Sequence, residues 1–311
     1  MSSSTRTSRS SAPRSGRRRE TRSVPGATTS RTAQAVAAER ALLTDMGVLA
    51  DPFARRMLTP TMAAILGLVR RLPSGVRTRS VTLAGLAARV LWFDTQVAGA
   101  LDGLVTQIVV IGAGYDSRAW RFRRDGVQFF ELDRGATQQD KARRAPGPGP
   151  VYVDADLTTH DAAAALLGRG LDPERPALFV VEGVTMYLDE EIVRKQLGEL
   201  GRRSGPGSRL AVDFLPPPHA GTSRNHRQNR LQRLARSGSG ESFRLTIGRP
   251  EAVELVTASG WDVNEATSMR DAARALIPRE SRLPLDAVNE HKTLVAASRR
   301  SHPAASPSTS V

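Results

Sequence analysis

From residue 107 onward, nearly continuous apolar runs alternate with segments of helical periodicity. The runs lie at 107–112, 127–133, 151–157, 177–183, 208–215 and 293–298, and a weaker one lies at 260–266. Strands buried on both faces have this continuous apolar character, whereas half-exposed strands alternate apolar and polar positions. The order therefore predicts an α/β fold built on a doubly wound, mostly parallel sheet of seven strands.

Before the first strand, apolar residues recur at three- and four-residue steps instead. Between residues 32 and 72 this helical spacing is interrupted by Pro52 and Pro60, and Pro73 follows its end, which predicts short helices joined by turns. A longer helix is predicted over 81–102. The sheet is thus expected to carry extra N-terminal helices over 31–104.

Both ends of the chain and one internal segment differ in composition. The first 24 residues contain seven arginines and one acid, which supplies +6 of the formal net charge of +14. Residues 1–30 and 300–311 have few large apolar side chains, so both are expected to be disordered and the folded domain to span 31–299. A basic insertion at 216–242 is expected to form part of a substrate cap. Its arginines recur every third residue from 224 to 236, which favours a solvated helix face over a nucleic-acid surface.

Composition also limits the chemistry. The apolar run "MLTPTMAAILGLV" lies between Arg56 and Arg70 and is too short to span a bilayer, so we expect a cytoplasmic protein with no membrane partner. The absence of cysteine excludes disulfides, thiolate metal sites and cysteine nucleophiles. The five histidines are scattered, and neither a zinc-protease motif nor a serine nucleophile elbow occurs, so no metal site is expected.

A glycine turn ends the first predicted strand, in the stretch "IVVIGAGYDSRAW". In a doubly wound sheet, ligands bind where the first strand turns into its helix, and Gly112 and Gly114 fall at that point. Glycines there let the main chain approach a ligand closely. A dinucleotide site would have a third glycine at the position occupied by Ser117, so that fingerprint is incomplete.

Acidic residues end the next two strands. Glu131 and Asp133 follow Gly112 by 19 and 21 residues, the spacing at which an acid meets a ribose diol held at the first turn. Asp133 is preferred for the ribose because it ends the strand. On the third strand, Asp156 is placed to accept a hydrogen bond from an adenine amino group, on the same face as Asp154. Glycine, acid and acid in this order suit adenosine without a pyrophosphate.

Several sequence blocks, taken in order, resemble the Rossmann-like class I S-adenosylmethionine-dependent methyltransferases, and within them the leucine carboxyl methyltransferase-like group. The resemblance covers roughly residues 30–299 and is carried by "TAQAVAAERALL", "DPFARRML", "AARVLWFD", "VVIGAGYDSRAWRF", "FFELD", "DADL", "VVEGVTMYL" and "FRLTIGRPEAVELVTASGW". It implies S-adenosyl-L-methionine as cofactor.

The resemblance also implies roles for individual residues. It places Arg89 at the methionine carboxylate, a role that suits a guanidinium because it forms paired hydrogen bonds to a carboxylate. It places Glu182 near the cofactor or substrate and lets Tyr187 shape the acceptor pocket, both as positioning groups. The predicted cofactor-binding set is Arg89, Gly112, Gly114, Asp133, Asp156, Leu157 and Glu182.

The function predicted is therefore O-methylation of a small molecule, at a carboxylate or a hydroxyl. An in-line transfer from a sulfonium needs mainly alignment, and a carboxylate acceptor needs no general base. A hydroxyl acceptor would be helped by a base, for which Glu182 or a histidine of the 216–242 insertion is a candidate. Three alternatives remain: an NAD(P)-dependent oxidoreductase, disfavoured by Ser117, a basic nucleic-acid-binding protein, and a methyltransferase fold that binds cofactor without turnover.

Overall fold

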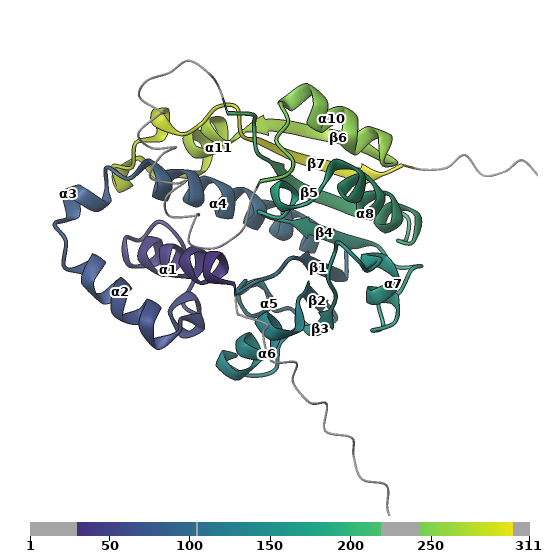
Figure 1. Ribbon diagram of the computed structural model, residues 1–311, viewed down its shortest axis with the longest axis horizontal. Coiled ribbons are helices and arrows are strands. Elements are labelled where there is room, and N and C mark those ends of the chain that lie inside the picture. The colour runs from purple at the N-terminus through teal and green to yellow at the C-terminus, as the bar shows by residue number, and fades with distance from the viewer. Residues whose placement is uncertain (1–29, 104, 219–242, 301–311) are drawn as a thin grey trace, which may run out of the picture.

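A seven-stranded sheet forms the centre of the computed structural model, which describes residues 30–103, 105–218 and 243–300 (Figure 1). The strand order is β3-β2-β1-β4-β5-β7-β6, and only β7 runs antiparallel to its neighbours. The strands are β1 Gln107–Ile111, β2 Gln128–Asp133, β3 Val151–Asp154, β4 Ala177–Val181, β5 Arg209–Phe214, β6 Trp261–Ser268 and β7 Thr293–Arg299. The predicted α/β, doubly wound and mostly parallel seven-stranded sheet is confirmed.

Helices precede the sheet and connect its strands, and the predicted N-terminal helices are present. Ser30, Thr59 and Ser80 start three of them by accepting hydrogen bonds from the free backbone N–H groups of the first turn. The α-helices are α1 Arg31–Asp45, α2 Pro60–Arg70, α3 Ser74–Arg77, α4 Val81–Leu101, α5 Arg118–Arg121, α6 Gly135–Arg144, α7 Ala162–Leu167, α8 Glu190–Arg202, α10 Arg249–Ala258 and α11 Met269–Leu276. Short 3-10 turns lie at η1 Ala54–Met57, η2 Thr185–Tyr187, η3 Arg279–Ser281 and η4 Leu285–Ala287.

Two apolar cores cover the two faces of the sheet. Successive side chains of a strand point to opposite faces, so Ile108 and Val110 of β1 enter one core while Val109 and Ile111 enter the other. The first core includes α1, α4 and α11, and the second includes α7, α8 and α10 (Figure 1). All five residues of β1 are buried, which explains why the four residues after Gln107 are all apolar.

One strand is shorter at the carboxyl edge of the sheet than the sequence suggests. Strand β3 ends at Asp154 rather than 157, because the Asp156 carboxylate turns the chain by accepting hydrogen bonds from the backbone N–H and hydroxyl of Thr158 (2.9 and 2.7 Å). Asp156 and Leu157 therefore lie in the loop after the strand. The helix after β1 is a single turn, α5.

Some expectations concern residues outside those described. The predicted segments 1–30, 216–242 and 300–311 lie outside the described residues, except for Ser30, 216–218 and Arg300. The arginine series 224–236 also lies outside them. No helix within the three described ranges combines the length and the apolar character needed to cross a membrane.

Candidate active site

A cavity of about 560 Å³ opens at the carboxyl ends of β1, β2 and β4. Helix α1 and the start of the chain described, from Ser30 to Arg40, form another part of its wall. The fold brings together at this cavity the seven residues of the predicted cofactor-binding set and Tyr187: Arg89, Gly112, Gly114, Asp133, Asp156, Leu157, Glu182 and Tyr187.

The glycine turn after β1 adopts a backbone conformation that other residues avoid. Gly112 and Gly114 have φ of +64° and +47°. A Cβ on Gly112 would lie 2.4 Å from Cγ2 of Val184, and one on Gly114 would lie 3.0 Å from Cβ of Ala33. The absent side chains thus let the loop after β4 and helix α1 close around the turn.

Asp133 at the end of β2 is fixed against this turn. Its Oδ2 accepts a hydrogen bond from the Gly114 N–H (2.6 Å), and its Oδ1 accepts one from the Arg134 N–H (2.6 Å). Burial raises the pKa of Asp133 above its ordinary value, although both N–H groups oppose the rise. The carboxylate therefore lines the cavity beside the glycine turn.

Glu131, the other acid that fits the ribose spacing, has a different role. Its side chain points into the core, where it pairs with the fully buried Lys141 of α6 and does not line the cavity. Burial raises the pKa of Glu131 to about 7, with Lys141 opposing the shift. The structure thus separates the two acids and leaves Asp133 at the site.

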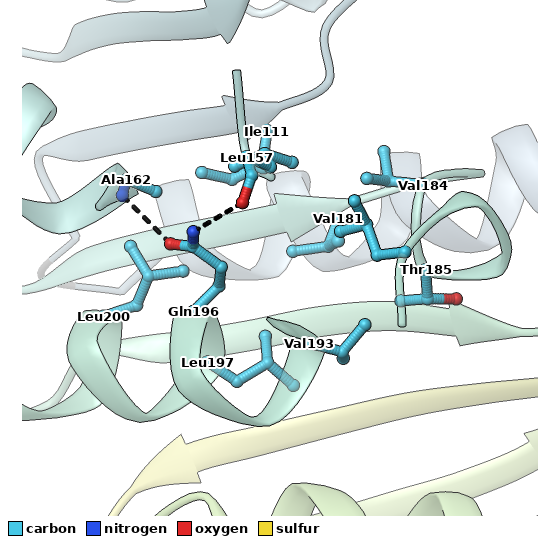
Figure 2. A pocket seen from close by; sticks show the side chains of 11 residues that line it. Ile111, Leu157, Ala162, Val181, Val184, Thr185, Val193, Gln196, Leu197 and Leu200 are labelled. Carbon is cyan, nitrogen blue, oxygen red and sulfur yellow. Dashed lines mark hydrogen bonds between the residues drawn. The ribbon is translucent and has the colours of Figure 1, made fainter. Parts of the chain in front are cut away.

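The loop carrying Asp156 and Leu157 is held by a buried glutamine of α8 (Figure 2). Gln196 donates hydrogen bonds to the carbonyls of Leu157 (2.9 Å) and His160 (2.6 Å) and accepts one from the Ala162 N–H (2.9 Å). A small void of about 20 Å³ lies behind this loop. Asp156 itself is held at its second oxygen by Arg134, with Nε 3.3 Å from Oδ2.

Opposite charges meet where β4 and β5 end. Arg89 of α4 donates from Nε to Oε1 of Glu182 (3.1 Å), and its Nη1 lies 3.9 Å from Oδ2 of Asp213. Asp213 in turn accepts a hydrogen bond from the Gly183 N–H (2.6 Å). Both Arg89 and Glu182 line the cavity, so a guanidinium and a carboxylate face it side by side.

A buried arginine that sequence reasoning did not assign to the site holds Glu182 from behind. Arg118, on α5, donates to Oε2 of Glu182 (2.7 Å), to Asp116 (2.6 Å) and to Asp94 (2.7 Å). Burial acts to raise the pKa of Asp116, but Arg118 and Arg40 outweigh it and hold the pKa well below the ordinary value. Arg118 lies in the motif "DSRAWRF". Its role becomes clear only in the folded protein, where it pairs with Asp94, Asp116 and Glu182.

Ser117, the residue found where a dinucleotide fingerprint has glycine, is a buried junction between α1 and the turn. Its hydroxyl accepts hydrogen bonds from Arg40 (2.6 Å) and Arg121 (3.0 Å) and donates one to Asp51 (2.8 Å). Arg40 also pairs with Asp51. The hydroxyl therefore fixes α1 over the cavity, a task that differs from the close helix packing that the third glycine serves in dinucleotide sites.

Tyr187 lies on the η2 turn after β4 and faces the remaining side of the cavity. Its ring packs against Phe243, with centroids 5.8 Å apart. The neighbouring Arg244 also lines the cavity, and it is fixed by a backbone hydrogen bond to Met186 (2.8 Å) and a side-chain one to Asp189 (2.7 Å).

Comparisons with known proteins identify relatives of this chain. A family model described as leucine carboxyl methyltransferase matches residues 30–200, which include all eight predicted residues. A protein of Mycobacterium avium (strain 104) whose name assigns it to the S-adenosyl-L-methionine-dependent methyltransferases is 30% identical over 283 residues, covering 79% of this chain and 88% of its own. A Mycobacterium marinum protein with the same assignment is 30% identical over 271 residues, covering 78% and 85%.

A solved structure shares the fold. The crystal structure of a Thermobifida fusca YX protein assigned as a methyltransferase superposes with a TM-score of 0.54. It is 16% identical in sequence, and the match covers 88% of this chain and 96% of that one.

Proposed function

The chain belongs to the leucine carboxyl methyltransferase family of S-adenosylmethionine-dependent methyltransferases, and from that premise we propose that it methylates an oxygen of a small molecule, with a carboxylate as the acceptor. One observation carries the proposal. The cavity places a paired guanidinium and carboxylate, Arg89 and Glu182, at one position and the Asp133 carboxylate at another.

The charged and polar groups that line the cavity suit S-adenosylmethionine. Its methionine end carries an ammonium and a carboxylate, and the adjacent charges of Glu182 and Arg89 are opposite in sign to these two groups, respectively. Asp133 offers a carboxylate to the ribose hydroxyls beside the glycine turn, and Asp156 with Leu157 would border the adenine. When bound, the cofactor supplies a methyl group on a positively charged sulfur, an electrophile that needs no metal.

Glu182 acts here as a positioning residue. Its two oxygens are held by Arg89 and Arg118, so the carboxylate has a fixed orientation. Both of its oxygens already accept a hydrogen bond from a guanidinium. We therefore assign Glu182 to holding the bound groups in place and not to proton transfer, which an acceptor that is already ionised does not need.

The other groups of the wall also favour an ionised acceptor. Among the described residues that line the cavity there is no histidine. Tyr115 donates to Asp140 (2.6 Å), and burial raises its pKa to about 12, so it is a poor base at neutral pH. Tyr187 would shape the acceptor side of the cavity, and the 216–242 insertion would complete it as a cap.

A methyl-transfer assay tests the acceptor class. The full chain is incubated with methyl-labelled S-adenosylmethionine and matched pairs of acceptors, each a carboxylic acid and the alcohol with the same carbon skeleton. A methyl ester releases labelled methanol on mild alkaline treatment, whereas an ether or a methylated amine keeps the label. We expect base-labile product from the acids. Base-stable product from the alcohols, with none from the acids, would contradict the proposal.

A further inference from the structure

Helix α2 is apolar on the side that faces solvent as well as on the side that faces the protein. Leu66 is buried, and Met62 and Val69 pack against the first core. Ile65 and Leu68 point outward, and a surface helix ordinarily carries polar residues on that side. No charged residue occurs between Pro60 and Val69.

The exposed apolar surface continues beyond this helix. Of the residues that the structure describes, those with large, exposed hydrophobic side chains are all in one short stretch: Ile65 (47% exposed), Leu68 (62%), Leu72 (45%) and Val76 (56%). They follow one another at steps of three and four residues. We refer to these four residues as the α2–α3 patch. Large apolar side chains that are exposed within one short stretch mark an interaction site more often than a single scattered residue does.

Arginines flank the α2–α3 patch in the sequence. From Pro52 to Ser80 the sequence contains six arginines and no acid, and the arginines are Arg55, Arg56, Arg70, Arg71, Arg77 and Arg79. One nearby acid, Asp45 of α1, pairs with Arg55 (2.6 Å) and Arg70 (3.0 Å). The segment therefore keeps a clear positive excess beside its apolar side chains.

The patch is presented on a fixed support at the edge of the molecule. Thr59 caps α2, Pro60 occupies its first position, and Leu66 anchors the helix in the core. Figure 1 shows α2 and α3 at the periphery, away from the sheet. The segment connects α1 with α4, and both of those helices contribute to the cavity wall.

We propose that the α2–α3 patch docks the protein onto an anionic lipid surface. Apolar side chains rimmed by arginines match the interface of such a membrane, where Leu and Ile enter the acyl boundary and guanidiniums meet lipid phosphates. Charge complementarity selects this partner over a neutral apolar surface. The contact is peripheral, since α2 is too short to span the bilayer. The proposal departs from the sequence-based expectation of no membrane partner by adding this peripheral contact.

Vesicle flotation with the full chain tests the proposal and needs no enzymatic activity. We expect the wild type to float with vesicles of phosphatidylglycerol and phosphatidylcholine, and much less with phosphatidylcholine alone. Ile65→Ser/Leu68→Ser changes only exposed side chains and should lower partitioning at least tenfold. Arg71→Gln/Arg79→Gln should also lower it, with a weaker dependence on salt.

A matched variant controls for charge alone. Arg169→Gln/Arg194→Gln removes two exposed arginines from the α7 and α8 region, on the opposite side of the sheet, and should leave partitioning close to that of the wild type. Equal flotation of wild type and Ile65→Ser/Leu68→Ser would overturn the proposal, because binding would then come from the basic N-terminal residues. Conversion of a dimer to a monomer by the same substitutions, without vesicle binding by the wild type, would identify the patch as a contact between two copies of the chain.

Discussion

Arg89 and Glu182, 93 positions apart in the sequence, face each other at the end of β4 with 3.1 Å between Nε and Oε1. One comes from a helix that precedes the sheet, and the other follows the fourth strand. Their charges lie side by side on the wall of one cavity. A ligand that carries both an ammonium and a carboxylate can exchange this internal ion pair for two external ones.

Replacement of Arg89 should weaken cofactor binding in a graded way. Arg89→Ala removes the group expected to bind the methionine carboxylate, and a charge-assisted hydrogen bond of this kind contributes about 1.5–3 kcal/mol. Titration calorimetry should therefore show the Kd for S-adenosylmethionine rising at least tenfold. Arg89→Lys keeps the charge but cannot form the paired hydrogen bonds, so its Kd should lie between those of the wild type and Arg89→Ala. Arg194→Ala, at an exposed site on α8, is the control and should bind like the wild type.

Gly112 should tolerate a side chain much less well than Gly126, although both glycines have a positive φ. Gly126 has φ +77° and open space around its Cβ position, so Gly126→Ala should cost about 1–2 kcal/mol of unfolding free energy. Gly112→Ala adds a clash with Val184 and should cost more, roughly 3 kcal/mol. Urea denaturation measures both.

The clash at Gly112 has its own test. In a double-mutant cycle, Val184→Ala should recover part of the loss caused by Gly112→Ala, with a coupling of about 1 kcal/mol, because the methyl group it removes is the one that a Cβ would meet. Strictly additive costs would show that backbone strain alone excludes alanine there.

The buried pair of Glu131 and Lys141 should make stability fall as pH rises above 5. The pKa of Glu131 is about 7 in the folded protein and ordinary in the unfolded chain, so the folded state binds more protons between those values. The stability linked to that proton is complete below pH 4.5 and is lost as pH rises through 7, a change of about 3 kcal/mol.

A neutral replacement of the pair isolates this effect. Glu131→Gln/Lys141→Met should flatten the dependence of unfolding free energy on pH between 5 and 8. Glu190→Gln/Arg194→Met removes an exposed pair of opposite charge from α8 and should leave the profile as it is in the wild type. An unchanged slope in the first variant would assign the dependence to other groups.

Gln196 should matter for the cofactor although it makes no direct contact with the cavity. Gln196→Leu leaves the carbonyls of Leu157 and His160 and the N–H of Ala162 without their partner, which should cost about 1–3 kcal/mol of stability. The loop of Asp156 and Leu157 then loses its support, so the Kd for S-adenosylmethionine should also rise. Val193→Ala, on the same face of α8, should lower stability through lost packing and leave that Kd nearly unchanged.

Patterns local in the sequence predicted much of this molecule. The apolar runs located six of the strands, most clearly β1 and β4, which are buried along their whole length. The run at 260–266 was weaker, because most residues of β6 are not fully buried and several are polar. Parallel strands end at one edge, which is why the glycine turn and Asp133 could be assigned to one site from spacing alone. The position of Arg89 depended on the family resemblance, since nothing in a single helix shows that one arginine faces inward.

Other features depend on contacts between distant segments. The role of Arg118 arises from Asp94, Asp116 and Glu182, which no sequence spacing groups together. The distinct roles of Glu131 and Asp133 likewise required the structure, because both acids fit the ribose spacing and only the partner Lys141 separates them. The early end of β3 follows from a side chain of Asp156 that bonds to its own loop.

Calorimetric titration of S-adenosylmethionine into the wild type, Asp133→Asn and Asp154→Asn tests the central claim most directly. Asp154 lies beside Asp133 in register on β3 and does not line the cavity, so it controls for the loss of a carboxylate at this edge of the sheet. We predict saturable binding by the wild type, at least tenfold weaker binding by Asp133→Asn, and wild-type affinity for Asp154→Asn. The absence of binding heat in the wild type, or equal affinity in all three proteins, would contradict the assignment of this cavity to the cofactor.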